Sequence, residues 1–515
     1  MENEAPHMES SPGTEWVNTK LRTLLLWGFG LVIAFGCVLR FWKLTGVGFW
    51  YDELWTVGGA SDRPFLEMYR EWILGDPHPP GFYLLNFLWF KLVPATEFWA
   101  RIPHAVTATA TVLYLVLGTR RVLTRDERVM SASFVSLSYL NIQYALEVKQ
   151  YSAVILLATI ATISYLEIVQ AGKLDRRTGV TLSVACVGLA YLNYFATAYA
   201  GILLLLLATT FRRDRDQLRG VVRLGAVWAL CYLPIAYFLY LQLVYTPGDW
   251  QTTDLGIFFS ELLASLFFDD PVYVRVALGV FIGSLVVMTI ARPELSTALR
   301  SRRNLHLLAI GLSMTGVMIL LGLSEPIFYP RYFLVVFPAF FIGAGILTAA
   351  MFPLRTGWVA VLPLVFFVKA AGVQYHEIDT LQRQQWDKSV DLVLEWNQPS
   401  DRVFVLGAKA DKTSFDYLRD GNADGVYYVK NVEFYEYYFR RRGAQEIADA
   451  LEVVEPTVES VWELAARFRD TGTTVYVLAG HHIHYSGEAL ATLERLAKKV
   501  DVTELYSTLV YTVTF

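Results

Sequence analysis

Long apolar segments alternate with short polar ones along the first three quarters of the chain. Each apolar segment is close to the length that an α-helix needs to cross about 30 Å of hydrocarbon, so we expect about eleven membrane-spanning helices. They are predicted at residues 22–42, 103–119, 129–146, 153–171, 180–195, 197–211, 221–243, 272–291, 304–323, 332–352 and 357–374. The pattern therefore predicts an α-helical polytopic membrane protein.

One apolar segment, "FYLLNFLWFKLV" at residues 82–93, is too short to be a span. A membrane-spanning helix needs roughly 17 residues or more. We expect a short helix that lies in the outer membrane interface. Counting it as a span would also reverse the side of every later loop.

Basic residues are concentrated in alternate loops between the predicted spans. The clusters are Arg120, Arg121, Arg125 and Arg128; Lys173, Arg176 and Arg177; Arg212, Arg213, Arg215 and Arg219; and Arg292, Arg300, Arg302 and Arg303. Basic loops stay on the cytoplasmic side of a membrane. We therefore expect a plasma-membrane protein with a disordered cytoplasmic tail at residues 1–21, a transmembrane region at 22–375 and a first external loop at 43–102.

The pattern changes after residue 375. Runs such as "RVFVLGA", "GVYYVKN", "TTVYVLAG" and "STLVYTVTF" are typical of strands, and "SVWELAARFRD" and "ALATLERLAKKV" are typical of helices. No glycine-rich phosphate loop joins a strand to a helix. Residues 376–515 are predicted to form an extracytoplasmic α/β domain.

Composition supports the membrane assignment and excludes some functions. The 515 residues are 54% hydrophobic and 18% charged, with a formal net charge of −4. Nucleic-acid binding needs clustered excess positive charge, so no nucleic-acid partner is expected. The histidines of "GHHIHYSGE", His481, His482 and His484, have no cysteine beside them. We expect a surface or core loop there, and neither a metal nor a cofactor in the protein.

Four motifs are predicted to lie at the outer ends of the spans. "GFWYDELWT" contains Asp52 and Glu53, and "GDPHPPGFYLLN" contains His78 between prolines. The remaining residues are Glu147, Lys149 and Tyr151 in "LEVKQY" and Arg331 and Tyr332 in "PRYF". Any one motif alone fits solvated acids or cations that reach the headgroups. Together they supply a base, acceptor-orienting groups and a phosphate clamp for transfer from an anionic lipid.

This combination of motifs resembles the GT-C class of membrane glycosyltransferases. These enzymes use polyprenyl-phosphate sugars and include the protein O-mannosyltransferases and the aminoarabinose transferase of lipid A. The resemblance covers roughly residues 22–345, whereas the C-terminal segment resembles no accessory domain of the class. It implies a GT-C-like fold.

The resemblance also implies roles for the motif residues. Asp52 would be the catalytic base, Glu53 its neighbour in the acceptor site and His78 a pocket residue. Lys149 and Arg331 would bind phosphate, although relatives often carry an arginine where this chain has Lys149. Glu147, Tyr151 and Tyr332 would complete the substrate-binding set.

The expected function is inverting transfer of a sugar, with mannose suggested by the resemblance alone. The donor would be a polyprenyl-phosphate sugar, and the acceptor a hydroxyl of a glycan, lipid or protein outside the membrane. Two alternatives remain open: a transporter or flippase of a lipid-linked sugar, and a sensor or scaffold with an external binding domain. In the enzyme, both Asp52 and Glu53 are expected to line a solvent-accessible cavity.

Overall fold

The computed structural model describes most of the chain. The described residues are 12–61, 63–76, 78–245, 300–322, 330–408, 414–420, 423–480 and 487–515, with single positions at 279, 282, 283 and 286. The span predicted at residues 272–291 therefore lies almost wholly outside the described residues, as do His481, His482 and His484.

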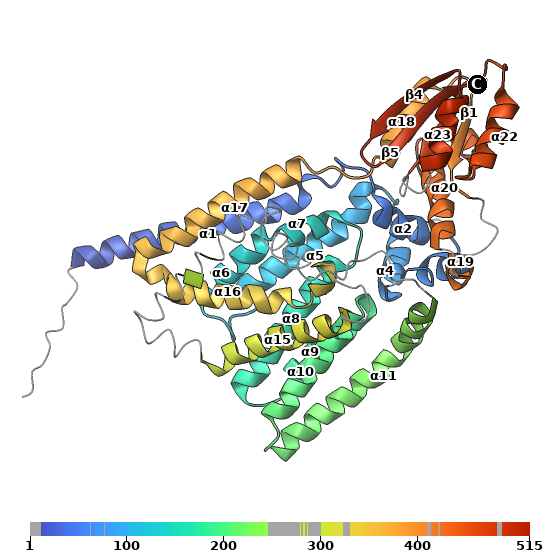
Figure 1. Cartoon of the computed structure of the whole chain (residues 1–515). Helices are drawn as coiled ribbons and strands as arrows, with labels where there is room; N and C mark the ends of the chain where they lie inside the picture. The colour runs from blue at the N-terminus through green and yellow to red at the C-terminus, as the bar shows by residue number, and fades with distance from the viewer. Residues whose placement is uncertain are drawn as a thin grey trace, which may run out of the picture.

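Six helices among the described residues are long and apolar enough to cross a membrane (Figure 1). They are α1 (Pro12–Trp42), α5 (Glu97–Leu117), α8 (Tyr151–Ala171), α11 (Arg215–Tyr245), α15 (Arg302–Gly322) and α17 (Val361–Asp379). Each coincides with a predicted span. Shorter helices occupy three further predicted spans, namely α9 (Arg176–Leu192), α10 (Phe195–Thr210) and α16 (Phe337–Met351). The predicted number of eleven spans is not confirmed.

The span predicted at residues 129–146 is wrong as a single helix. It is divided into α6 (Arg125–Leu137), α7 (Tyr139–Gln143) and the 3-10 turn η2 (Tyr144–Leu146). Ser138 has extended backbone angles, φ −63° and ψ 123°. The buried Arg40 of α1 donates to the carbonyls of Val135 at 2.9 Å and Ser136 at 2.8 Å. It therefore satisfies carbonyl groups that the end of α6 leaves without a helical partner.

Short helices form the loop between α1 and α5. They are α2 (Tyr51–Ala60), α3 (Phe65–Glu67), η1 (Met68–Ile73) and α4 (Gly81–Phe90). Asp52 and Glu53 lie in the first turn of α2, where negative charge is favourable, and Glu53 accepts from the backbone N–H of Trp50 at 3.3 Å. Helix α4 matches the short helix predicted at residues 82–93. Two 3-10 helices, η3 (Pro330–Phe333) and η4 (Leu354–Ala360), flank α16.

A five-stranded mixed sheet lies near the C-terminus, in the order β2-β1-β3-β5-β4. The strands are β1 (Arg402–Leu406), β2 (Glu452–Val454), β3 (Val475–Ala479), β4 (Lys499–Leu505) and β5 (Thr508–Thr514). Strand β1 is parallel to β2 and β3, whereas β5 is antiparallel to β3 and β4. Strands β1, β3 and β5 coincide with three of the predicted strand runs.

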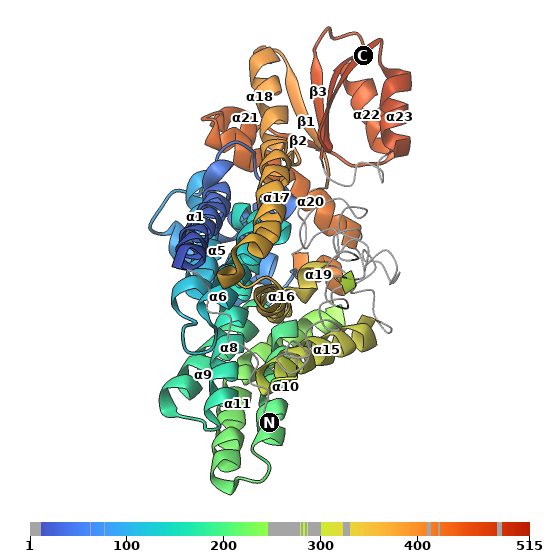
Figure 2. The same ribbon diagram turned by 90° about the vertical axis from the view of Figure 1, so that its left-hand side faces the viewer.

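Both faces of this sheet are covered by helices (Figure 2). Alternate strand residues point to opposite faces, so Phe404 packs with α22 (Val458–Phe468) and α23 (Gly487–Leu496), while Val405 belongs to the core shared with α18 (Trp386–Trp396). The remaining helices are α19 (Ser414–Arg419), α20 (Ala423–Arg441) and α21 (Gln445–Asp449).

The strand predicted at "GVYYVKN", residues 425–431, is wrong because these residues lie within α20. Aromatic and branched residues favour strands, but the buried side chains of Lys430, Phe434 and Tyr438 recur every four residues, which places them on one helical face. The predicted helix that reaches residue 500 is also too long, since α23 ends at Leu496 and β4 follows.

Helix α20 joins the C-terminal region to the loop that carries α2. The ring of Phe434 lies 5.2 Å from that of Tyr51, and the Lys430 Nζ lies 3.6 Å from the ring centre of Trp72. One hydrophobic core contains Phe434, Tyr51, Trp72 and the helices of the transmembrane region. The position of α2 is therefore fixed from the transmembrane side and from the C-terminal side.

Candidate active site

The candidate residues lie beside the ends of the long helices. Trp42 ends α1, Glu97 begins α5, Tyr151 begins α8 and Asp379 ends α17. The motifs adjoin these helix ends in the sequence, and hydrogen bonds and ion pairs join residues of different motifs in space. Helix packing thus brings together residues separated by about 280 positions in the chain, such as Asp52 and Arg331.

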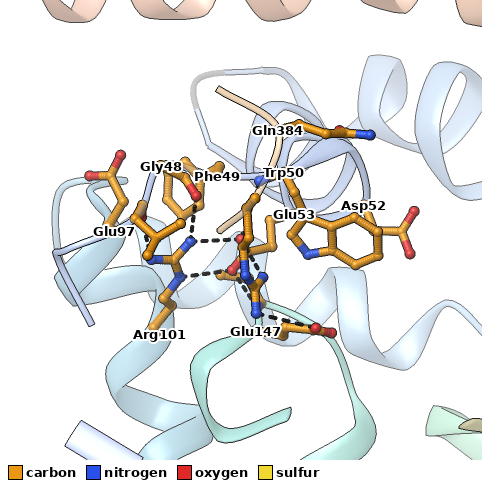
Figure 3. A network of polar contacts seen from close by, with 12 residues as sticks. Gly48, Phe49, Trp50, Asp52, Glu53, Glu97, Arg101, Glu147 and Gln384 are labelled. Carbon is orange, nitrogen blue, oxygen red and sulfur yellow. Dashed lines mark hydrogen bonds and ion pairs between the residues drawn. The ribbon is translucent and has the colours of Figure 1, made fainter. Parts of the chain in front are cut away.

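Glu53 is the centre of a buried ionic network (Figure 3). Arg101 of α5 donates to it through Nε at 2.8 Å and Nη2 at 2.7 Å. Arg383, which follows α17, donates from Nη1 at 3.0 Å, and the backbone N–H of Val148 donates at 3.0 Å. Glu53 therefore connects α2 with α5, with the segment before α8 and with the segment after α17.

The surroundings of Glu53 stabilise its negative charge. Burial alone would raise the pKa of this carboxyl, but the charges of Arg101 and Arg383 and the hydrogen bonds from Arg101 and Val148 bring it below its ordinary value. Its side chain is 0% exposed. The expectation that both carboxylates line an accessible cavity is therefore wrong for Glu53, because Arg101 and Arg383 enclose it.

Asp52 differs from its neighbour in direction and exposure. Its carboxylate points away from the Glu53 network (Figure 3), since successive helical residues point about 100° apart. The Asp52 side chain is 24% exposed, and its Oδ2 accepts from the Arg331 Nη1 at 3.0 Å. Asp52 is thus the member of the pair that is open to a molecule arriving from outside the core.

Glu147 shares Arg383 with Glu53. Its Oε1 accepts from the Arg383 Nη2 at 3.2 Å and from the Gln143 amide at 3.3 Å. Burial, reinforced by the nearby charges of Glu53 and Asp52, raises the pKa of Glu147 to about 7, although Arg383 and Arg331 act in the opposite direction. The site therefore contains a buried carboxyl group that changes its charge near neutral pH.

A second cluster surrounds Asp76. The Tyr83 hydroxyl donates to Asp76 at 2.5 Å, the Nδ1 of His78 contacts the other carboxylate oxygen, and the Lys149 Nζ lies 3.6 Å from Oδ2. Burial would raise the pKa of Asp76, but His78, Lys149 and these hydrogen bonds hold it well below its ordinary value. Asp76 therefore anchors both His78 and Lys149.

Aromatic residues line the side of the site near Arg331. The ring of Tyr151 lies 4.5 Å from that of Tyr144, and the ring of Tyr332 lies 5.1 Å from that of Phe195. The Arg331 guanidinium carbon is 5.9 Å from the centre of the Tyr332 ring. The side chains of Tyr151 and Tyr332 are both buried, so packing sets their positions.

The structure thus places the eight predicted residues around Glu53, around Asp76 and around the pair of Asp52 and Arg331. It also adds three residues that the sequence analysis missed. Asp76 lies in the same motif as His78 and could have been found there. Arg101 is a charged residue within an apolar helix, which is a recognisable signal. Arg383 lies between two helices in a segment without any pattern, so nothing in the sequence marks it.

The described part of the chain contains no group of three His, Cys, Asp or Glu side chains arranged to hold a metal ion.

Comparisons with known proteins give a family match and a fold match. Residues 77–238 match the model of the family described as dolichyl-phosphate-mannose-protein mannosyltransferase. The crystal structure of ArnT from Cupriavidus metallidurans in the apo state aligns with a TM-score of 0.56 and 12% identity over 98% of each chain. ArnT from the same organism bound to undecaprenyl phosphate aligns with a TM-score of 0.51 and 14% identity, over 94% of this chain and 97% of that one. No curated protein matches the sequence.

The chain has the ArnT-like GT-C fold, which confirms the predicted fold class. The family match over residues 77–238 and this fold agree with the prediction of an enzyme, a membrane glycosyltransferase of the GT-C class. The prediction made from the four motifs is confirmed at that level.

Proposed function

We propose that the protein transfers a sugar from a polyprenyl-phosphate donor to an acceptor hydroxyl at the outer face of the membrane. Two findings support the donor class: ArnT has been solved with undecaprenyl phosphate, and the matched family is described by its dolichyl-phosphate-mannose substrate. We propose mannose as the sugar because the description of the matched family names it. The outer face follows from the basic loops at 120–128, 173–177 and 212–219, which we place in the cytoplasm.

The observation that carries the proposal is the contact between Asp52 and Arg331. One end of this pair is a partly exposed carboxylate and the other is a cation from a late segment of the chain. Asp52 takes the proton of the acceptor hydroxyl while that oxygen attacks the anomeric carbon of the sugar. The bond from this carbon to the phosphate oxygen breaks, so a single displacement inverts the configuration.

Lys149 and Arg331 stabilise the phosphate that leaves. The phosphate gains negative charge as the bond breaks, and cations held in fixed positions stabilise that charge. Each cation is held by a carboxylate before a donor arrives, Lys149 by Asp76 and Arg331 by Asp52. This arrangement reduces the reorganisation needed during the reaction.

The test is consumption of polyprenyl-phosphate sugars by the purified protein. A panel of donors is incubated with wild type and with Asp52→Asn, and turnover of the variant should fall by about 10² to 10⁴. Asp391→Asn is the matched control, since Asp391 pairs with Arg442 on the surface. Failure of wild type to consume any donor would overturn the proposal. Translocation of an intact lipid-linked sugar would instead support the transporter alternative.

A further inference from the structure

Arg383 reaches the candidate active site from a distant part of the chain. It follows α17 and precedes α18, and its side chain is 6% exposed. Its Nη1 donates to Glu53 and its Nη2 donates to Glu147, at 3.0 Å and 3.2 Å. A single planar guanidinium thus bridges two carboxylates that come from different elements.

The neighbours of Arg383 fix its position. The side-chain oxygen of Gln384 accepts from the backbone N–H of Tyr51 at 2.8 Å and from the Trp386 indole at 3.2 Å. The guanidinium carbon of Arg383 lies 5.8 Å from the ring centre of Trp50. The segment after α17 therefore contacts three residues at the start of α2, namely Trp50, Tyr51 and Glu53.

Arg101 does not duplicate the bridge that Arg383 makes. Its Nε and Nη2 bind Glu53, and its Nη1 binds the backbone carbonyls of Leu44 and Val47. Glu147 instead accepts a hydrogen bond from Arg383, while the charges of Glu53 and Asp52 oppose the ionisation of Glu147. Without Arg383, Glu147 would lose the cation that most favours its charged form, so it would either take up a proton or carry its charge unpaired beside Glu53.

We propose that Arg383 is a positioning residue that holds the catalytic helix α2 and the segment carrying Lys149 in register with each other. The link is direct, because Glu53 accepts from the Val148 backbone N–H and Lys149 is the next residue. Asp52 is next to Glu53 in the chain, and Lys149 is next to Val148. Each of the two functional residues therefore neighbours a residue of the network that Arg383 completes. The inference rests on the proposed function and extends it, since it makes the segment after α17 part of the support of the active site.

The first test separates positioning from binding. Arg383→Met removes the bridge at similar length, and turnover per folded molecule should fall about 10²-fold, because small displacements of reacting groups have effects of this size. The donor KM should change far less than kcat. Arg383→Lys keeps one charged contact and should recover part of kcat. If both variants lost activity equally at low donor concentration and turned over at the wild-type rate at saturating donor, the loss would lie in KM and the proposal would be overturned.

Arg442→Met is the matched control. Arg442 borders the same cavity of about 470 Å³ as Arg383, but its guanidinium pairs with Asp391 at 2.6 Å and 2.9 Å. It should leave kcat unchanged. A loss of kcat equal to that of Arg383→Met would show that any cation at this cavity has the same effect, which contradicts a specific bridge.

A second test needs no donor and therefore survives failure of the proposed function. Arg383→Met should lower the thermal unfolding midpoint at a pH well above 7, where Glu147 would have to carry its charge without Arg383. Adding Glu147→Gln should recover part of the loss at that pH by removing one unpaired carboxylate. If the double variant unfolds at the same temperature as Arg383→Met or below it, Arg383 does not hold Glu147. If wild type consumes no donor while this recovery is seen, the proposed function fails and the contact remains.

Discussion

Replacing Glu53 by Gln tests whether the buried network holds the protein together. The substitution keeps the size of the side chain but removes its charge and exchanges one acceptor oxygen for an NH2 group. From the sequence alone, neither Asp52→Asn nor Glu53→Gln is expected to unfold the protein, because both acids are expected in a solvent-accessible cavity. The contacts of Glu53 predict a different result, a clear loss of stability.

The magnitude follows from the donors around each oxygen. Oε1 accepts from the Arg101 Nε and the Val148 N–H, and Oε2 accepts from Arg101, Arg383 and Trp50. The new NH2 group therefore faces at least two N–H donors in either orientation. With the NH2 group at the Oε1 position, losing one charge-assisted bond of about 1.5–3 kcal/mol and one neutral bond of about 0.5–1.5 kcal/mol gives roughly 2–4.5 kcal/mol. Breaking a buried ion pair typically costs about 3–5 kcal/mol, which agrees.

The assay is thermal unfolding of the purified variants in one detergent at one heating rate. Unfolding of membrane proteins is often irreversible, so midpoints are compared only under matched conditions. Asp52→Asn is the control, because a partly exposed ion pair contributes about 0–1 kcal/mol. Glu53→Gln should unfold several degrees below both wild type and this control. Equal midpoints for Glu53→Gln and Asp52→Asn would refute the reasoning.

Three further predictions address the cations, the second cluster and the topology. Lys149→Ala should impair donor use by the equivalent of about 1.5–3 kcal/mol, with Lys149→Arg milder, and unchanged donor kinetics in both would contradict a phosphate contact. The lowered pKa of Asp76 stabilises the fold above the ordinary aspartate pKa, and this stability is lost as pH falls through the lowered value. Unfolding midpoints of Asp76→Asn should therefore depend less on pH below about 4 than those of wild type, and parallel curves would count against it. A reporter that is active only in the cytoplasm should be silent after Phe515, and a strong signal would reverse the topology.

The sequence by itself determined the helices that cross the membrane and the motifs that gather at their ends. Apolar length and basic loops are local properties, so α1, α5, α8 and α17 could be located from the residues alone. The eight candidate residues were found because each motif adjoins the end of an apolar segment. Strands β1 and β5 were also found from local pattern.

Only the tertiary structure decided which carboxylate is buried and which is accessible. Asp52 and Glu53 are adjacent in α2, and their different surroundings come from Arg101 and Arg383, which lie 48 and 330 residues from Glu53 in the chain. The break at Ser138 likewise depends on carbonyl contacts from Arg40. Hydrophobic pattern reports which residues avoid water along one segment, whereas the partner of a charged group depends on how distant segments pack together.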